Sequence, residues 1–149
     1  MAKKKKKAKL QLQLHADTDS AVAVESPDLW QQAHHQAMSV PLAELAGTLQ
    51  ELLSRRVTTQ IAGVKDGKTI TRWSSGEITE IRDIEVERRL RTAYEIAQLL
   101  LVTESPQTVK AWFIGLNPLL TDTSPIEALS AGQLKETIGA ARAFGDETP

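Results

Sequence analysis

The stretch IRDIEVERRLRTAYEIAQLLLV, residues 81–102, has the most regular hydrophobic pattern in the chain and decides the fold. Its apolar residues return every three or four positions, at Val86, Leu90, Ala93, Ala97 and Leu100/Leu101. This spacing is typical of an α-helix with a buried face. The charged residues Arg82, Arg88, Arg89 and Glu95 take the other faces. We therefore expect a long helix over 81–102 at the centre of an all-α fold.

Two shorter helices are predicted before this stretch. Ser26-Pro27-Asp28 is a helix-start signal, with Ser as cap and Pro in the first turn. The helix that follows, 27–38, has an apolar stripe made of Trp30, Ala33, His34, Ala37 and Met38. Pro41 opens the next helix, whose inner face is predicted to hold Leu42, Leu45, Leu49 and Leu52/Leu53.

A pair of short helices is predicted between these and the long helix. The first spans about 56–64, and Lys65-Asp66-Gly67 is a turn signal. The second spans 68–75 and is closed by Gly76. Thr69-Ile70-Thr71 has some strand propensity, but no segment of the chain has the pattern of a strand.

Three further helices are predicted after the long helix. Ser105-Pro106 starts the first, and Gly115 with Asn117-Pro118 ends it. The sequence Ser124-Pro125-Ile126-Glu127 is a capping box, in which Ser124 and Glu127 bond each other's backbone amides. The helix it starts ends near Gly132, and a last helix spans 133–144.

Composition narrows the class of protein. The chain has 149 residues, of which 41% are hydrophobic and 4% aromatic, so we expect a modest aliphatic core. Cysteine is absent, which excludes disulfides and thiolate chemistry. No apolar run is long enough for a membrane span, and the basic start leads into alternating Gln and Leu rather than a signal peptide. These features fit a cytoplasmic protein that does not enter membranes.

The net charge of −1 conceals an uneven distribution. Lysines dominate residues 1–10, basic residues dominate 55–76, and acidic residues dominate 104–149. Such asymmetry indicates two different partners. We divide the chain into a disordered lysine-rich tail (1–25), N-terminal helices (26–80), a connecting long helix (81–103) and a small C-terminal helical module (104–149).

Residues 57–73 have the parts of a helix-turn-helix, in which the second helix enters the DNA major groove. Ile61, Val64 and Ile70 would form its small core, covered by Trp73. The residues predicted to point outward are Lys68, Thr69, Thr71 and Arg72. Arg72 is the candidate base contact because a guanidinium can bond guanine in a bidentate way. Arg55, Arg56 and Lys65 suit phosphate contacts. The alternative is the solvated basic edge of an ordinary helical bundle.

The run Gly63-Val64 … Thr69-Ile70-Thr71-Arg72-Trp73-Ser74-Ser75-Gly76 resembles the Xre-type helix-turn-helix. In that family a Gly-Val turn leads to a Thr-Ile-Ser-Arg-Trp recognition helix and a terminal Gly. This chain departs from the pattern in two ways. Its turn is one residue longer, and Thr59 stands where a small Ala is typical.

Residues 104–144 resemble the toxin-binding domain of the MbcA/ParS/Xre antitoxins. The resemblance rests on Trp112-Phe113-Ile114-Gly115, Asn117-Pro118-Leu119-Leu120, Ser124-Pro125-Ile126-Glu127-Ala128-Leu129, Gly132 and Ala140-Ala141. It implies an antitoxin that occludes a RES-domain, NAD-degrading toxin and represses its own operon. The residues it implies for toxin binding are Trp112, Asn117, Arg142 and Phe144. The alternative is structural: Trp112, Phe113, Leu119 and Leu129 would be core residues, and the Asn-Pro and Ser-Pro pairs a turn and a helix start.

No motif for an enzyme is found: there is no phosphate loop, zinc-type spacing or nucleophile elbow. The adjacent His34 and His35 point about 100° apart on a helix and lack a third ligand, so we expect no metal. We expect no cofactor and no catalytic residue. Three functions remain open: a DNA-binding antitoxin, acting as a homodimer or a higher toxin–antitoxin assembly; a stand-alone transcriptional regulator; and a protein-interaction adaptor that never contacts DNA.

Overall fold

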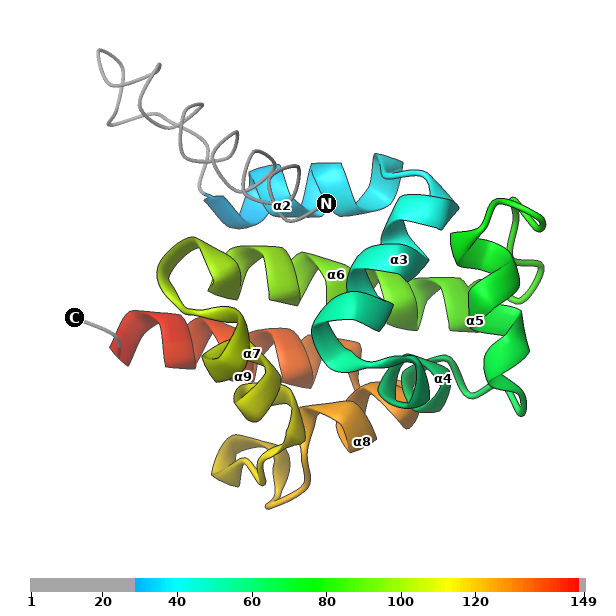
Figure 1. The fold of residues 1–149 in the computed structure, drawn as a ribbon. Helices are drawn as coiled ribbons and strands as arrows, with labels where there is room; N and C mark the ends of the chain where they lie inside the picture. The colour runs from blue at the N-terminus through cyan, green and yellow to red at the C-terminus, as the bar shows by residue number, and fades with distance from the viewer. Residues whose placement is uncertain (1–28, 148–149) are drawn as a thin grey trace, which may run out of the picture.

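The computed structural model describes residues 29–147, which form eight α-helices, one 3-10 turn and no strand (Figure 1). The predicted lysine-rich tail, the Ser26-Pro27-Asp28 helix start and the last two residues lie outside the described residues. The helices are α2 (Leu29–Ser39), α3 (Leu42–Leu53), α4 (Arg55–Ala62), α5 (Gly67–Ser74), α6 (Ile84–Thr103), α7 (Pro106–Ile114), η2 (Pro118–Leu120), α8 (Pro125–Ser130) and α9 (Leu134–Glu147). The all-α class predicted from periodicity is confirmed for this part of the chain.

The central helix is α6, which lies between α2 on one side and α9 on the other (Figure 1). It also packs against α3, α4, α7 and α8. Its predicted apolar face is buried: Leu90, Ala93 and Ala97 are fully inaccessible. The helix begins at Ile84, three positions later than expected, because the Asp83 carboxylate accepts from the amides of Glu85 (2.9 Å) and Val86 (3.3 Å). Arg82 therefore precedes the helix.

Two predicted side-chain placements near α6 are wrong. Glu95 was expected on an open face of the long helix, but it is buried at 6% exposure because α2 covers that face. In α2 the predicted stripe is too wide: Ala33 and Ala37 are buried, whereas His34 and Met38 are exposed. A helix that meets its neighbour along one narrow line buries residues at i and i+4 and leaves the flanking positions in solvent.

Local capping signals place the C-terminal helices. The Ser105 side chain accepts from the Thr108 amide at the start of α7. The capping box is confirmed, since Ser124 Oγ accepts from the Glu127 amide and Glu127 Oε1 accepts from the Ser124 amide, both at 3.1 Å. The last helix starts one residue later than predicted and extends three residues further, to Glu147.

One hydrophobic core connects the described elements. Its buried members extend from Ala37 in α2 to Ala141 in α9 without a break between the N-terminal and C-terminal helices. Contact between α4 and α8 is direct, and Ser130 Oγ donates to the Gln60 carbonyl at 2.9 Å. The helices before and after α6 therefore share one apolar core. Residues 104–147 depend on this core and do not have one of their own.

Candidate nucleic-acid interface

Helix α4 has defined start and end points. The Ser54 hydroxyl accepts from the Val57 amide at 3.1 Å, and Gly63 ends the helix with a φ of 75°. Such a left-handed backbone favours glycine. Arg89 of α6 then satisfies the last carbonyls of α4, donating from Nε to Ile61 O (3.0 Å) and from Nη2 to Ala62 O (2.7 Å). A Cβ on Gly63 would stand 3.1 Å from Arg89 Nη2, so the glycine also makes room for this contact.

Residues 63–66 connect α4 to α5. Asp66 caps α5 by accepting from the Lys68 amide at 2.9 Å. Beyond the last residue of α5, Gly76 adopts a φ of 84°, as expected of a glycine that closes a helix. Because a carboxylate already occupies the start of α5, an approaching phosphate would have to be bound by side chains rather than by the backbone amides there.

The inner side of the α4–α5 pair (residues 55–74) is apolar, as predicted. Ile61 and Ile70 are fully buried, Trp73 is 4% exposed, and Val64 packs partly buried against the same core. Both helices also pack on α3. The orientation of α5 is therefore fixed by its Ile70 and Trp73 side, and the opposite side faces solvent.

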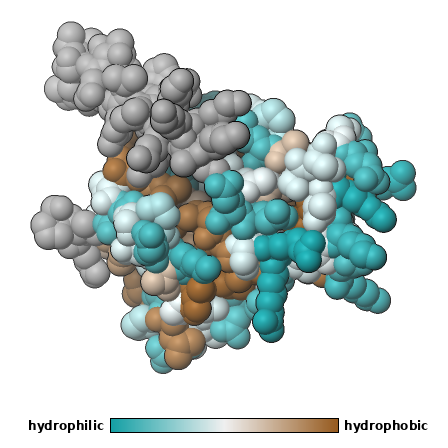
Figure 2. Space-filling model, viewed as in Figure 1, coloured by the Kyte–Doolittle hydropathy of each residue, from teal (hydrophilic) through white to brown (hydrophobic). Residues whose placement is uncertain are grey.

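The predicted DNA-contacting residues are exposed to solvent, with one exception. Arg55, Arg56, Lys65, Lys68, Thr71 and Arg72 are exposed. Thr69 is partly buried, so it is less available for contact than expected. Figure 2 shows mostly hydrophilic surface on the side of the molecule where α5 lies.

Two of these arginines have partners within the chain. Arg72 Nε lies 3.7 Å from Glu77 Oε2, and both side chains are more than half exposed, so the ion pair is weak and easily exchanged. Arg55 Nη1 donates to Thr71 Oγ1 at 3.3 Å, which joins the start of α4 to the outer side of α5. The structure thus brings Arg55 to α5 rather than leaving it directed at solvent alone.

The residues predicted to bind a toxin make contacts within the chain. Trp112 is 9% exposed and makes an edge-on contact with Phe113 at 5.2 Å between ring centroids. Phe144 lies 6.3 Å from the Trp112 ring. Asn117 caps η2 through its side chain, which accepts from the Leu119 amide at 2.9 Å. The Arg142 guanidinium lies 5.0 Å from the centroid of the Trp30 ring, a cation–π distance.

Three large apolar side chains near Trp112 are exposed instead. Ile114, Leu116 and Leu119 have exposed fractions of 50%, 73% and 64%, and we call them the apolar cluster. Figure 2 shows hydrophobic surface at the end of the molecule where η2 lies. Phe113 and Leu129 are buried as the structural alternative predicted, but Leu119 is not, so that part of the alternative is wrong.

Other polar contacts that the sequence did not indicate hold α2 and the residue that follows it, Val40, on α6. Arg91 Nη1 donates to the carbonyls of Ala37 (2.8 Å) and Val40 (2.9 Å), and its Nε pairs with Glu87 at 2.9 Å. His34 Nδ1 lies 2.8 Å from Glu95 Oε1. From sequence alone, an arginine or a glutamate in a helix is expected to face solvent. Only the three-dimensional structure shows these contacts.

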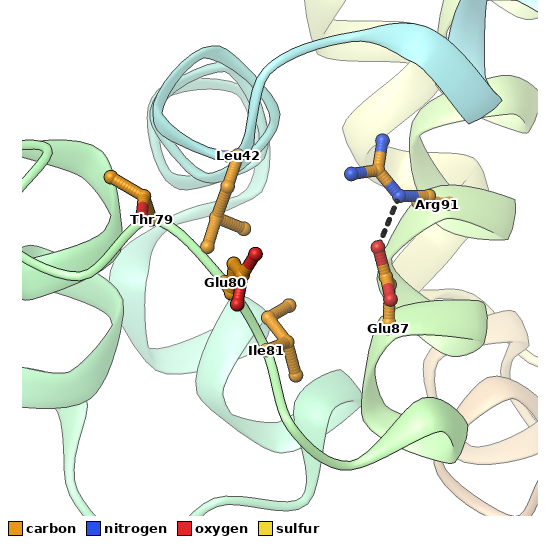
Figure 3. Close-up of a pocket in the computed structure, with 6 residues that line it drawn as sticks. All are labelled: Leu42, Thr79, Glu80, Ile81, Glu87 and Arg91. Atoms are coloured by element: carbon orange, nitrogen blue, oxygen red, sulfur yellow. Dashed lines mark hydrogen bonds and ion pairs between the residues drawn. The ribbon is translucent and has the colours of Figure 1, made fainter.

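A hollow of about 370 Å³ lies beside Arg91 (Figure 3). Leu42, Thr79, Glu80, Ile81 and Glu87 complete its wall. The Arg91 guanidinium is already bonded to Glu87 and to two backbone carbonyls, so it has little capacity left for an anionic ligand. The hollow marks where the 79–81 segment meets α3 and α6, and it is a weaker candidate site than the α4–α5 pair.

Metal and membrane sites find no support in the described part of the chain. Within residues 29–147 no group of three His, Asp or Glu side chains could hold a metal ion. No helix in the same range combines the length and apolar character needed to cross a membrane. Burial, together with the nearby Glu44 carboxylate, raises the pKa of Tyr94 to about 12, but this phenol lies in the core rather than in a site.

No family model, no curated protein and no solved structure matches this chain. The functional argument therefore depends on the geometry above and on the sequence motifs.

Proposed function

We propose that this chain is a DNA-binding antitoxin of a type II toxin–antitoxin system. In this proposal α4 and α5 form a helix-turn-helix, α5 enters the major groove of operator DNA, and the chain represses its own operon. The C-terminal helices neutralise a RES-domain, NAD-degrading toxin by occlusion. The protein acts by binding rather than catalysis, in the cytoplasm, without a cofactor, as a homodimer or a larger assembly with the toxin.

The observation that carries the DNA-binding half is the two-sided character of α5. Ile70 and Trp73 fix one side of this helix in the core, while Lys68, Thr71 and Arg72 remain exposed on the other. The major groove admits an α-helix whose outward side chains can reach base edges. Arg55, Arg56 and Lys65 supply positive charge next to it, which suits the phosphate backbone.

The DNA-binding half is tested by selecting bound sequences from a duplex pool with randomised base pairs. Wild-type protein should enrich a motif. Arg72→Ala should lose about 1–3 kcal/mol of discrimination at one base pair of that motif while keeping its helical circular dichroism. Arg56→Ala is the matched control, because loss of a phosphate contact weakens all duplexes alike and lowers the salt dependence by about one unit. Equal binding of wild-type protein to every duplex would overturn this half.

The toxin-binding half is supported by the apolar cluster. Exposed apolar patches of this kind mark protein interaction sites. The acidic composition of residues 104–149 adds a surface distinct from the basic α4–α5 pair.

The toxin-binding half is tested by purifying the tagged chain from its native host and identifying what co-elutes in moderate salt. A stoichiometric partner that consumes NAD once it is released would establish the antitoxin function. Elution of the chain alone as a homogeneous oligomer would overturn this half and leave a stand-alone transcriptional regulator.

A further inference from the structure

The side chain of Arg55 lies across the backbone of α5 at Gly67. A Cβ placed on Gly67 would stand 3.1 Å from Arg55 Nε, 3.4 Å from Cδ and 3.5 Å from Cγ. Gly67 has no left-handed backbone that would itself require glycine. A side chain at this position would therefore require Arg55 to shift.

This approach brings the guanidinium to Thr71, one turn further along α5. Arg55 Nη1 donates to Thr71 Oγ1 at 3.3 Å, and Thr71 Oγ1 donates in turn to the Gly67 carbonyl at 3.4 Å. A threonine hydroxyl has one proton to donate. With that proton directed to Gly67 and one lone pair directed to Arg55, the hydroxyl has no proton left to donate to a base, and the methyl group is what Thr71 can offer to an apolar group of a ligand.

We infer that Thr71 recognises the C5-methyl group of a thymine, and that Arg55 is a positioning residue that fixes Thr71 rather than a phosphate contact. Contact between a threonine methyl and the thymine methyl is a known form of major-groove recognition. The inference rests on the proposed DNA-binding function. It replaces the phosphate contact predicted for Arg55 with a positioning role. It also assigns Thr71, predicted only to point outward, to one specific base.

The experiment uses the full chain and a duplex pool with randomised base pairs. After selection, each thymine of the enriched motif is replaced in turn by uracil, which removes only the C5-methyl group. One replacement should weaken wild-type binding about fourfold, the effect of one buried methyl-sized group.

Two conservative variants separate the methyl group from the hydroxyl of Thr71. Thr71→Val keeps a methyl and removes the hydroxyl, so it should retain the preference for thymine over uracil. Thr71→Ser keeps the hydroxyl and removes the methyl, so it should bind the two duplexes equally. The opposite pattern would show that the hydroxyl contacts the base and would overturn the inference.

Arg55→Lys tests the positioning role. Lysine keeps the positive charge but lacks the guanidinium nitrogen that donates to Thr71 Oγ1. We expect the thymine preference to fall toward that of Thr71→Ser, with the salt dependence of binding unchanged. An intact thymine preference in Arg55→Lys would show that Arg55 does not position Thr71.

The outcomes distinguish this inference from the proposed function. If wild-type protein enriches no motif, the proposed DNA-binding function fails, and the inference fails with it. If a motif is enriched but uracil replaces every thymine without loss, only the role of Thr71 is overturned. Circular dichroism of each variant checks whether these exposed substitutions leave the fold intact.

Discussion

The α4–α5 pair and the α7–η2 region use their motif residues in opposite ways. In the α4–α5 pair, the apolar motif residues Ile70 and Trp73 form the core and the polar ones, such as Arg72, are exposed. In the α7–η2 region, Trp112 and Asn117 are engaged in packing and capping, while the exposed side chains are apolar. One surface suits a charged, hydrated ligand and the other suits a protein.

The difference shows that a residue can define a motif without contacting the partner. Trp112 and Asn117 shape the segment that presents Leu116 and Leu119, so replacing them would alter the apolar cluster indirectly. Arg72, by contrast, makes only a weak ion pair and can be replaced without disturbing the core. Replacing Trp112 or Asn117 should therefore change both stability and binding, whereas replacing Arg72 should change binding alone.

The largest effect should come from removing residues 104–149. Because Val109, Phe113 and Leu129 are fully buried in the same core as α4 and α6, the remaining fragment would expose apolar surface on both helices. We expect it to lose cooperative thermal unfolding, as measured by circular dichroism and calorimetry. Co-expression of 104–149 as a separate chain should restore the fold. A fragment 1–103 that unfolds cooperatively by itself would show that the two regions are independent modules.

The next effect separates Trp112 from the apolar cluster. Trp112→Ala should lower the free energy of unfolding by about 3–5 kcal/mol, because it leaves a cavity between Phe113 and Phe144. Leu119→Ala, at a side chain that is 64% exposed, should change it by less than about 0.5 kcal/mol. Urea denaturation measures both. Similar losses of unfolding free energy in the two variants would show that Trp112 is no more important to the packing than the exposed Leu119.

Local signals in the sequence predicted most of the helices. Periodicity located α6, and Ser124 with Glu127 located α8, because each signal depends on residues within one or two turns. Even so, the start of α6 was misplaced, since Asp83 competes with Ile81 as the first helical signal. The exposure of Lys68, Thr71 and Arg72 in α5 was also predicted correctly, unlike that of Thr69, because the buried Ile70 and Trp73 determine which side faces outward.

Contacts between distant segments could not be predicted in this way. Arg89 bonds carbonyls about 28 positions earlier in the chain, and His34 meets Glu95 across 61 positions. Nothing near Glu95 in the sequence indicates that α2 will cover it. The exposure of Leu119 has the same origin, because η2 turns Leu120 inward to pack and leaves Leu119 in solvent.

A third effect tests how α6 orients the α4–α5 pair. Arg89→Ala removes two hydrogen bonds to the last carbonyls of α4 and leaves those carbonyls without a donor, so we expect a loss of about 3 kcal/mol in unfolding free energy. Arg88→Ala is the control, because its ion pair with Glu85 is 3.7 Å long and exposed, which predicts a change under about 0.5 kcal/mol. Equal stability of the two variants would show that the α4 end is held by other contacts.

The smallest effect concerns pH and the buried phenol of Tyr94. Its pKa is raised from 10.0 to about 12, first by burial and then by the Glu44 carboxylate. The folded state therefore favours the neutral phenol. The resulting stabilisation is complete below pH 10 and is lost as the pH rises toward 12, with a total on the order of 2 kcal/mol. Tyr94→Phe should lose less stability between pH 10 and 12 than the wild-type protein. This difference distinguishes the Tyr94 titration from that of the lysines.

Alkaline unfolding also tests whether the two regions come apart together. Trp73 lies in the α4–α5 pair and Trp112 in α7, and Tyr94 lies in the helix that contacts both regions. Variants in which Trp30 and one of these two tryptophans are replaced by Phe report each region by fluorescence. Because one core connects both regions, the two transitions should coincide in pH, as they do in a two-state protein. If the Trp112 signal changed first, the C-terminal helices would form a separate unit of stability, and the contrast between the two regions would extend from their surfaces to their folding.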